Sequence, residues 1–270
     1  MPLTPFQRHV ESIRARQVMT GEAAPRAVGL DDSSLYVQLL QLRQDVGTLR
    51  DLHSNAERFQ MKRDVMLPRW LPWAEKYLEA GDIYQNSVFV WCIVWLMDIR
   101  KFEQALNWAD IAIEQGQESP EGFRNNLPGT VADEVLDWSE IEFEAGRSIE
   151  PFFSQTFKNV TERWKLNEQL TAKYYKLAGF LILRGADGRI NPANLDDPAA
   201  LRQADLYLEA AGTLYKNAGV TSLRGRIAAR LRKLETTPQR GAGAAEGVGE
   251  ENADHAVDAG QPATSETEGA

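Results

Sequence analysis

The feature that most constrains the fold is an unbroken apolar run from Val88 to Met97, which includes two tryptophans. Its ten residues are about half the length needed to span a bilayer. Because the run has no polar face, it predicts a helix buried on all sides at the centre of the molecule. A parallel strand can also be continuously apolar. We favour the helix because no Gly-rich turn and no second run of this kind occur elsewhere to complete a sheet.

The residues after this run predict a second helix that is buried on one face. Phe102, Ala105, Leu106, Ala109 and Ile113 follow the spacing of one helical face. The chain has a single cysteine, Cys92, and it lies inside the apolar run. It therefore has no partner for an internal disulfide, and we expect it to act as a small buried hydrophobe.

The rest of the chain predicts an all-α protein made of packed helical hairpins. The expected helices are 4–19, 33–64, 73–80, a helix from Thr130 carrying Val135, Trp138 and Ile141 toward the core, 151–164, 166–183, 198–217 and 222–235. The prolines of the segment Met66–Trp73 are expected to break the helix twice and form a rigid, aromatic-packed corner. The segments Ala74–Ala80 and Ala204–Ala210 are alike, which leaves a tetratricopeptide-like array as a possible architecture.

We expect four parts: a basic N-terminal helix and loop (1–32), a long helix for oligomerisation (33–64), a helical domain (65–235) and a disordered acidic tail (236–270). The net charge of −9 is unevenly distributed, since residues 70–150 contain five Lys/Arg and sixteen Asp/Glu. Global charge therefore says little about nucleic acid, although a local basic face could still bind phosphate. With no secretory signal evident, we expect a cytosolic protein.

The helix expected at 33–64 contains a seam with alternating spacings of four and three residues. Its leading members are Leu35, Leu39, Leu42, Val46 and Leu49. Such a heptad stripe predicts self-association through a coiled coil. The alternative is an amphipathic helix packed on the core of its own chain.

The sequence offers few candidates for catalysis. It has no phosphate loop of the G-x-x-x-x-G-K-[ST] kind, no Cys/His set with zinc spacing, and only three histidines. Asp133, Asp137 and Glu140, continued by Glu144, would share one helical face and could hold a hard divalent cation such as Mg²⁺ if the chain were a nuclease. The alternative is a solvated acidic face, and we expect no other cofactor.

Two basic helices are candidates for contacts with DNA phosphates. Arg8, Arg14 and Arg16 lie in the N-terminal helix, and Arg224, Arg226 and Arg230 lie in the last one. Neither helix shows a helix-turn-helix pattern, so an ordinary basic surface is the alternative.

Several motifs carry a resemblance to a known family. They are Pro5-x-Gln7-Arg8-His9, Leu67-Pro68-x-Trp70-Leu71-Pro72-Trp73, Trp95 with the later Ala105-Leu106-x-x-Ala109, and Glu134-Val135 after a Pro-containing loop. Over residues 3–235 the chain resembles the GpM-type small terminase subunits of cohesive-end tailed phages. The resemblance implies a homo-oligomer that recognises double-stranded phage DNA. It also implies a large ATPase subunit as partner in cohesive-end cleavage and genome packaging, in the cytoplasm of the bacterial host, from a virus or prophage. The family is labelled an endonuclease subunit, but no nuclease or ATPase motif is evident here, so enzymatic activity stays open.

Two other functions remain open from the sequence. One is a non-enzymatic helical-repeat scaffold that binds a peptide of another protein, and the other is a stand-alone metal-dependent DNA endonuclease. No membrane partner is expected.

Overall fold

The computed structural model describes residues 32–236, with side chains from residue 37 onward, and these residues form an all-α fold. Within this range the only β feature is an isolated bridge between Arg184 and Ile190. The α-helices are α2 (Asp32–Asp51), α3 (Asn55–Met61), α4 (Leu67–Ala80), α5 (Ser87–Asp98), α6 (Phe102–Glu114), α7 (Leu127–Glu144), α8 (Phe152–Glu162), α9 (Glu168–Leu183), α10 (Pro198–Leu214) and α11 (Thr221–Thr236). A π-helical turn, η1 (Lys62–Met66), and two 3₁₀ turns, η2 (Pro192–Asn194) and η3 (Lys216–Ala218), complete the described chain. The all-α prediction is confirmed.

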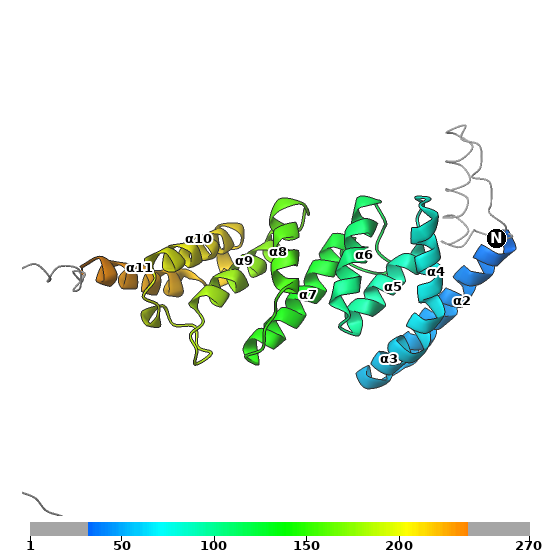
Figure 1. The fold of residues 1–270 in the computed structure, drawn as a ribbon, viewed down its shortest axis with the longest axis horizontal. Helices are drawn as coiled ribbons and strands as arrows, with labels where there is room; N and C mark the ends of the chain where they lie inside the picture. The colour runs from blue at the N-terminus through cyan, green and yellow to red at the C-terminus, as the bar shows by residue number, and fades with distance from the viewer. Residues whose placement is uncertain (1–31, 237–270) are drawn as a thin grey trace, which may run out of the picture.

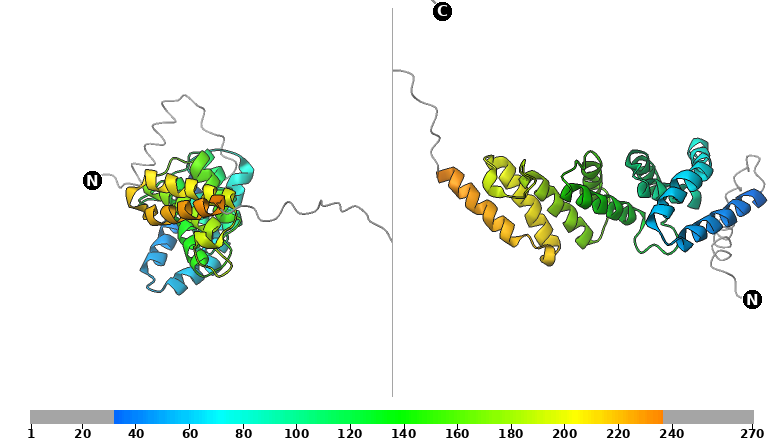
Figure 2. Two further views of the ribbon diagram at one scale, coloured as in Figure 1. Left: turned by 90° about the vertical axis from the view of Figure 1, so that its left-hand side faces the viewer. Right: turned by 90° about the horizontal axis from the view of Figure 1, so that it is seen from below.

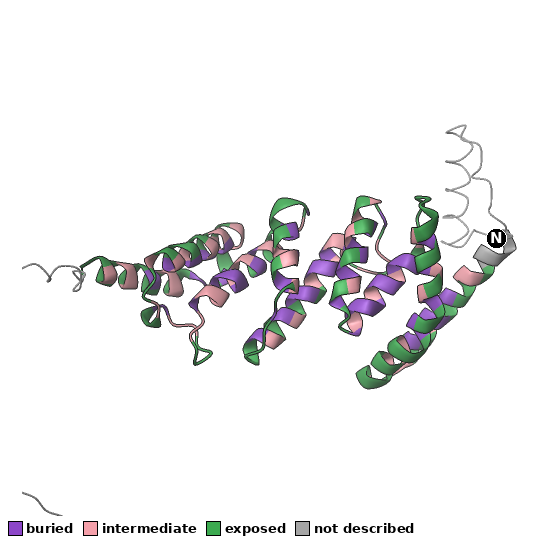
Figure 3. Cartoon of the chain, in the orientation of Figure 1, coloured by how far each residue is buried: buried purple, intermediate pink, exposed green. Residues whose placement is uncertain are grey.

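The helices are stacked in an elongated row, with α2 and α3 at one end and α11 at the other (Figure 1). The end-on view in Figure 2 shows that the row has a narrow cross-section. Helices that follow one another in sequence, such as α4 and α5 or α9 and α10, pack against each other. Buried residues face the inside of the row along its whole length (Figure 3). The more specific tetratricopeptide arrangement remains a prediction.

The apolar run forms α5 at the centre of the larger core cluster, as predicted. Phe89, Ile93 and Trp95 are fully buried, and α5 packs against α4, α6 and α7. The helix is not covered on all sides, however, because Trp91 and Val94 are only partly buried. The gap in its covering lies toward α2 and α3, where a pocket forms.

A second core cluster lies between α9, α10 and α11, around Leu201, Leu208 and Ile227. Helix α9 contributes to both clusters, so it joins the two halves of the row. Its Gly179 allows close approach, because a Cβ there would lie 2.9 Å from Cγ of Leu208. The stretch expected as one helical domain, 65–235, therefore contains two hydrophobic cores.

The prediction of a corner that breaks the helix twice between Met66 and Trp73 is wrong. Helix α3, η1 and α4 follow one another without a break, and Pro72 lies inside α4. A proline ring normally clashes with the carbonyl four residues earlier. For Pro68 that carbonyl belongs to Asp64, which lies in the wider π-helical turn where Leu67 N–H bonds to the carbonyl of Lys62. The π turn thus gives the first proline room.

The break occurs earlier than predicted and divides the helix expected over 33–64. Helix α2 ends at Asp51, and the Ser54 hydroxyl caps the new helix by accepting from the backbone N–H of Glu57. Serine favours such caps because its side chain competes with helical backbone bonding. The predicted basic helix near the N-terminus and the predicted acidic tail lie outside the described residues.

The start predicted at Thr130 for the helix after α6 is also wrong. Helix α7 begins at Leu127, and Asn126 caps it by accepting from Gly129 N–H at 3.0 Å. Pro128 occupies the first turn, where its missing N–H costs nothing. The expected burial of Val135 is confirmed, whereas Ile141 is 56% exposed.

Candidate functional site

The predicted DNA-binding arginines fall into two groups, of which the structure describes one. Arg8, Arg14 and Arg16 lie outside the described residues. Arg224, Arg226 and Arg230 lie on α11, and each makes hydrogen bonds within the chain.

Arg224 is the most strongly held of these arginines. Its guanidinium donates to both carboxylate oxygens of Asp205, at 2.8 and 3.0 Å, and to Glu209 at 3.0 Å. The hydrogen bonds that Arg224 donates to the Asp205 carboxylate are the main reason that the pKa of Arg224 is raised. Two carboxylates on α10 therefore neutralise this cation, and it links α10 to α11.

The other two arginines differ in how much charge they leave for a ligand. Arg230 donates to the carbonyl of Leu195 at 3.0 Å and pairs with Asp196, and its side chain is only 15% exposed. Arg226 is exposed and donates to a neutral amide, Oδ1 of Asn191, at 2.8 Å. Of the predicted α11 set, Arg226 alone therefore faces solvent without an acidic partner in the described part of the chain.

The acidic stripe of α7 does not form a recognisable metal centre. Among residues 32–236, no group of three or more His, Cys, Asp or Glu side chains is arranged to hold a metal ion. Asp137 and Glu140 are exposed. The pKa of Glu140 is raised, first by partial loss of water and also by repulsion from Asp137 and Glu144, while Lys173 opposes the shift. The geometry resembles a solvated acidic face more than a ligand cluster.

The seam expected to mediate oligomerisation is mostly used within the chain. Leu42, Val46 and Leu49 are buried in the larger core cluster, and Leu39 packs partly against it. The side chain of Leu35 is not described. On another part of α2, Val37 and Leu40 are 60% and 38% exposed. The buried part of the seam fits the alternative of a helix packed on its own core.

Asp45 attaches α2 to the row. It is 6% exposed, and its carboxylate accepts from Arg69 at 2.8 and 2.7 Å and from the indole N–H of Trp70 at 2.9 Å. Gln41 adds a fourth hydrogen bond at 3.0 Å. These contacts hold the C-terminal half of α2 against α4.

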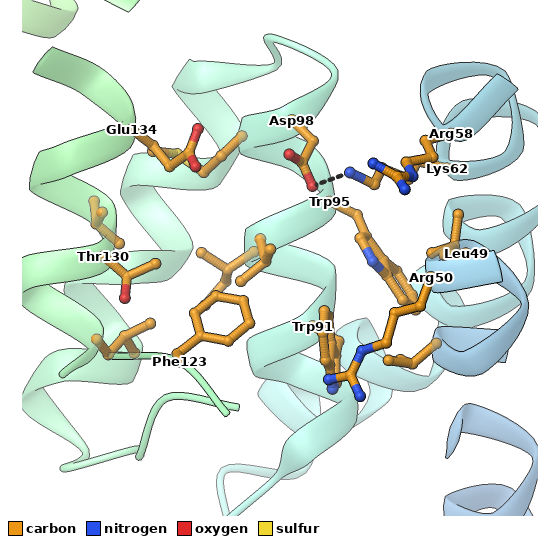
Figure 4. A pocket seen from close by; sticks show the side chains of 16 residues that line it. Leu49, Arg50, Arg58, Lys62, Trp91, Trp95, Asp98, Phe123, Thr130 and Glu134 are labelled. Atoms are coloured by element: carbon orange, nitrogen blue, oxygen red, sulfur yellow. Dashed lines mark ion pairs between the residues drawn. The ribbon is translucent and has the colours of Figure 1, made fainter. Parts of the chain in front are cut away.

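A pocket of about 370 Å³ opens between α2 and α3 on one side and α5 and α7 on the other (Figure 4). Its walls are mainly apolar and aromatic. The indole of Trp91 and the ring of Phe123 meet edge-to-face, with centroids 5.7 Å apart. The lining residues are Val46, Leu49, Arg50, Arg58, Lys62, Trp91, Ile93, Val94, Trp95, Met97, Asp98, Phe123, Leu127, Thr130, Val131 and Glu134.

The charged residues of the pocket stand on two sides. Figure 4 shows Arg50, Arg58 and Lys62 on the α2–α3 side and Glu134 on α7. Lys62 pairs with Asp98 at 2.7 Å. Part of the Glu134 side chain is exposed, yet its pKa is raised, mainly by loss of water and then by repulsion from Asp98.

Two N–H donors in the pocket lining have no hydrogen-bond acceptor within residues 32–236. They are Nε1 of Trp95, a residue with 0% exposure, and Nε of Arg58. Buried polar atoms are usually paired, because an unpaired donor costs about 1–3 kcal/mol. The pocket therefore combines an apolar floor with hydrogen-bonding capacity that the described chain does not use.

Sequence reasoning missed this pocket. The available signal was the pair Trp91 and Trp95, one helical turn apart, together with Arg50 and Arg58 on a helix expected to be amphipathic. The break between α2 and α3 brings the two arginines to one pocket, and that break was not predicted.

The comparisons with known proteins agree with one another. The family model of the phage small terminase subunit matches residues 39–169. A protein of Haemophilus phage HP1 (strain HP1c1), named "Probable terminase, endonuclease subunit", is 40% identical over 235 residues, which are 87% of this chain and 84% of the relative. The "Terminase, endonuclease subunit" of Escherichia phage P2 is 28% identical over 185 residues, which are 68% of this chain and 73% of the relative. No solved structure matches the chain.

The fold and the comparisons together define an all-helical phage protein of the DNA-packaging machinery. The chain belongs to the phage small terminase subunit family, as the resemblance in the sequence implied. The whole pocket lies within the segment that the family model matches, whereas α11 lies outside it. Among helices of the described chain, none combines the length and apolar content needed to cross a bilayer.

Proposed function

We propose that this chain is the DNA-recognition subunit of a phage terminase and acts with a large ATPase subunit in cohesive-end cleavage and genome packaging. The observation that carries the proposal is the 40% identity to the HP1 protein over 87% of this chain. The site of action is the cytoplasm of the infected or lysogenic bacterium.

Double-stranded DNA is bound through phosphate contacts of the basic helices. Arg8, Arg14 and Arg16 supply one set of contacts. On α11, Arg226 contributes most, because within residues 32–236 its side chain bonds to a neutral amide and to no carboxylate. Arg224 would have to leave two carboxylates to reach a phosphate. Its charge is already paired with these carboxylates inside the chain, so it has little to gain from a phosphate.

A salt series tests this proposal with the full chain and duplex DNA that contains the phage packaging site. The logarithm of the binding constant should fall linearly with the logarithm of salt concentration. Arg226→Gln should reduce the magnitude of the slope by about 1, and Arg224→Gln should change it less. No binding at low salt would refute recognition by this subunit alone, and an unchanged slope for Arg226→Gln would exclude that residue as a phosphate contact.

Endonuclease activity in this subunit is the second candidate, because both relatives are named as endonuclease subunits. The candidate residues remain Asp133, Asp137 and Glu140, with Mg²⁺ as the metal. The purified chain should then cut phage DNA only with Mg²⁺, and Asp133→Asn with Asp137→Asn should abolish cutting. Cutting that needs the large subunit and survives both substitutions would place the nuclease elsewhere.

Self-association through α2 is the proposed assembly mode. Leu42, Val46 and Leu49 are occupied by the chain's own core, so the contact would use the N-terminal half of the helix with Leu35 and Leu39. The exposed Val37 and Leu40 supply further apolar surface there. Light scattering should show a multimer for the full chain and a smaller species for Val37→Glu with Leu40→Glu.

A further inference from the structure

The pocket between α2–α3 and α5–α7 has no role in the DNA contacts proposed above. Its size of about 370 Å³ is near the lower end of typical ligand pockets, about 300–1,000 Å³. That is room for one bulky side chain and its neighbours. We propose that it is a docking socket for a segment of a partner protein that inserts an aromatic or large aliphatic side chain next to a carboxylate.

The apolar lining of the pocket favours an apolar side chain as the part of the partner that inserts. Trp91, Val94 and Phe123 are partly buried and present apolar surface to the pocket. Interface hot spots have this construction, in which a central apolar anchor is surrounded by polar groups that exclude water. A fully polar peptide would gain little from such walls.

The positive charges on the α2–α3 side of the pocket favour a carboxylate in the docked segment. Arg50 is exposed and makes no side-chain hydrogen bond or ion pair with the described chain. Arg58 makes one long bond, 3.4 Å to Oδ1 of Asn55, and leaves its Nε unpaired. Guanidinium groups pair with carboxylates more strongly than with neutral acceptors. One carboxylate beside these arginines would meet complementary charge on the side away from Glu134.

Helix α3 allows the socket to adjust. None of its residues is buried, so it is the α-helix of the described chain with the weakest attachment to a core. The indole Nε1 of Trp95 and Nε of Arg58 lie just beneath the pocket surface. A small movement of α3 would expose the Arg58 donor, which this helix carries, to a carboxylate or carbonyl of the docked segment, because weakly attached elements move at low cost.

The surroundings favour a protein segment over DNA. The loop that carries Phe123 also carries Glu118, Glu121 and Arg124. Helix α7 carries Glu134 in the pocket lining, and Asp137 follows three residues later, so acids outnumber bases on the side of the pocket away from the arginines. A single carboxylate can reach the arginines without passing these acids. A nucleic-acid backbone, with one charge per phosphate, would run past several of them and be repelled.

This inference rests on the proposed function in one respect, because it takes the terminase large subunit of the same phage as the partner. The test measures the dissociation constant between the full chain and the purified large subunit, and in parallel the binding of packaging-site DNA to the full chain. Two variants change the socket. Thr130→Trp fills it from α7, where the Thr130 hydroxyl makes only a 3.5 Å bond, and Arg50→Glu reverses a charge at its rim.

Each variant has a matched control outside the socket. Ile141→Trp adds the same bulk at an exposed position of α7, and Lys76→Glu makes the same charge change at an exposed position of α4. Circular dichroism of all four variants confirms that they fold. We expect about 30-fold weaker binding of the large subunit for each socket variant, the size of a hot-spot loss, with controls and DNA binding unchanged.

The possible outcomes are distinct. Large-subunit binding that is equal for the wild type and both socket variants overturns the docking proposal and leaves the proposed function standing. Loss of DNA binding in the socket variants, with large-subunit binding retained, makes the pocket a nucleic-acid site and also overturns it. A wild-type chain that binds neither DNA nor the large subunit refutes the proposed function itself and the docking proposal with it.

Discussion

Replacing Asp45 tests how α2 is held on the row. In Asp45→Ala the indole N–H of Trp70, a residue that is 2% exposed, loses its acceptor. A buried donor left unpaired costs about 1–3 kcal/mol. Arg69 loses two charge-assisted bonds, but its side chain is 44% exposed and can turn to water, so its contribution is smaller. Part of this loss is offset, because the variant no longer has to take a carboxylate out of water when it folds. We expect a net destabilisation of about 1–3 kcal/mol.

Urea unfolding followed by circular dichroism measures this change, and hydrogen exchange localises it. Amides of α2 should lose protection in Asp45→Ala, while those of α9 and α10 in the second core should keep it. Asp51→Ala is the matched control, since Asp51 is an exposed carboxylate at the end of the same helix. It should change stability by less than about 0.5 kcal/mol. Equal stability of Asp45→Ala and Asp51→Ala would refute the view that the Asp45 contacts hold α2.

Two further predictions concern the interior. Gly179→Ala should destabilise by about 1–2 kcal/mol, because the overpacking cost of a Cβ placed 2.9 Å from Leu208 Cγ exceeds the gain in helix propensity. Gly225→Ala on α11, where nothing lies within 4 Å of the added Cβ, should instead stabilise by about 0.5–1 kcal/mol in the same urea assay; the same sign for both would contradict the close approach of α9 and α10. Stability should also fall as pH rises above about 9–10, because burial raises the pKa values of Cys92 and Tyr174 in the folded state, so these groups lose their protons more readily when unfolded. Tyr174→Phe should flatten the fall above pH 10 in urea midpoints measured from pH 8 to 11, and midpoints that do not change over this range would refute the prediction.

Much of the fold could be predicted from the sequence, since it follows from local rules. The apolar run gives α5, α10 begins at Pro198 as expected, and α4 ends at Ala80 as expected, before the left-handed Gly81. The errors arose where tertiary packing or backbone geometry overrode a local signal. Pro68 did not break the helix, because a π turn next to it makes room for its ring. Pro72 also lies inside α4, and the π turn does not account for it.

The candidate sites were less predictable than the fold. A sequence shows where the arginines are, but it does not show which acidic side chains pair with them in the folded chain. Arg224 and Arg226 are two residues apart and look equivalent as letters. In the fold, the first faces two carboxylates of α10 and the second faces only the Asn191 amide. The pocket was even harder to predict from the sequence, because its lining spans residues 46–134 and comes from four α-helices, η1 and a loop.

The Asp45 contacts and the proposed socket depend on each other through α2. Val46, Leu49 and Arg50 follow Asp45 directly on this helix, and all three line the pocket. Loosening α2 would therefore remove one wall of the socket while the cores around α5 and α9 remain intact. Asp45→Ala should then weaken binding of the large subunit although Asp45 itself does not line the pocket. The loss of affinity for the large subunit should correlate with the loss of hydrogen-exchange protection in α2. It should not correlate with the urea midpoint for unfolding of the second core. Such local coupling is expected in an elongated row, where each helix is stabilised mainly by its neighbours.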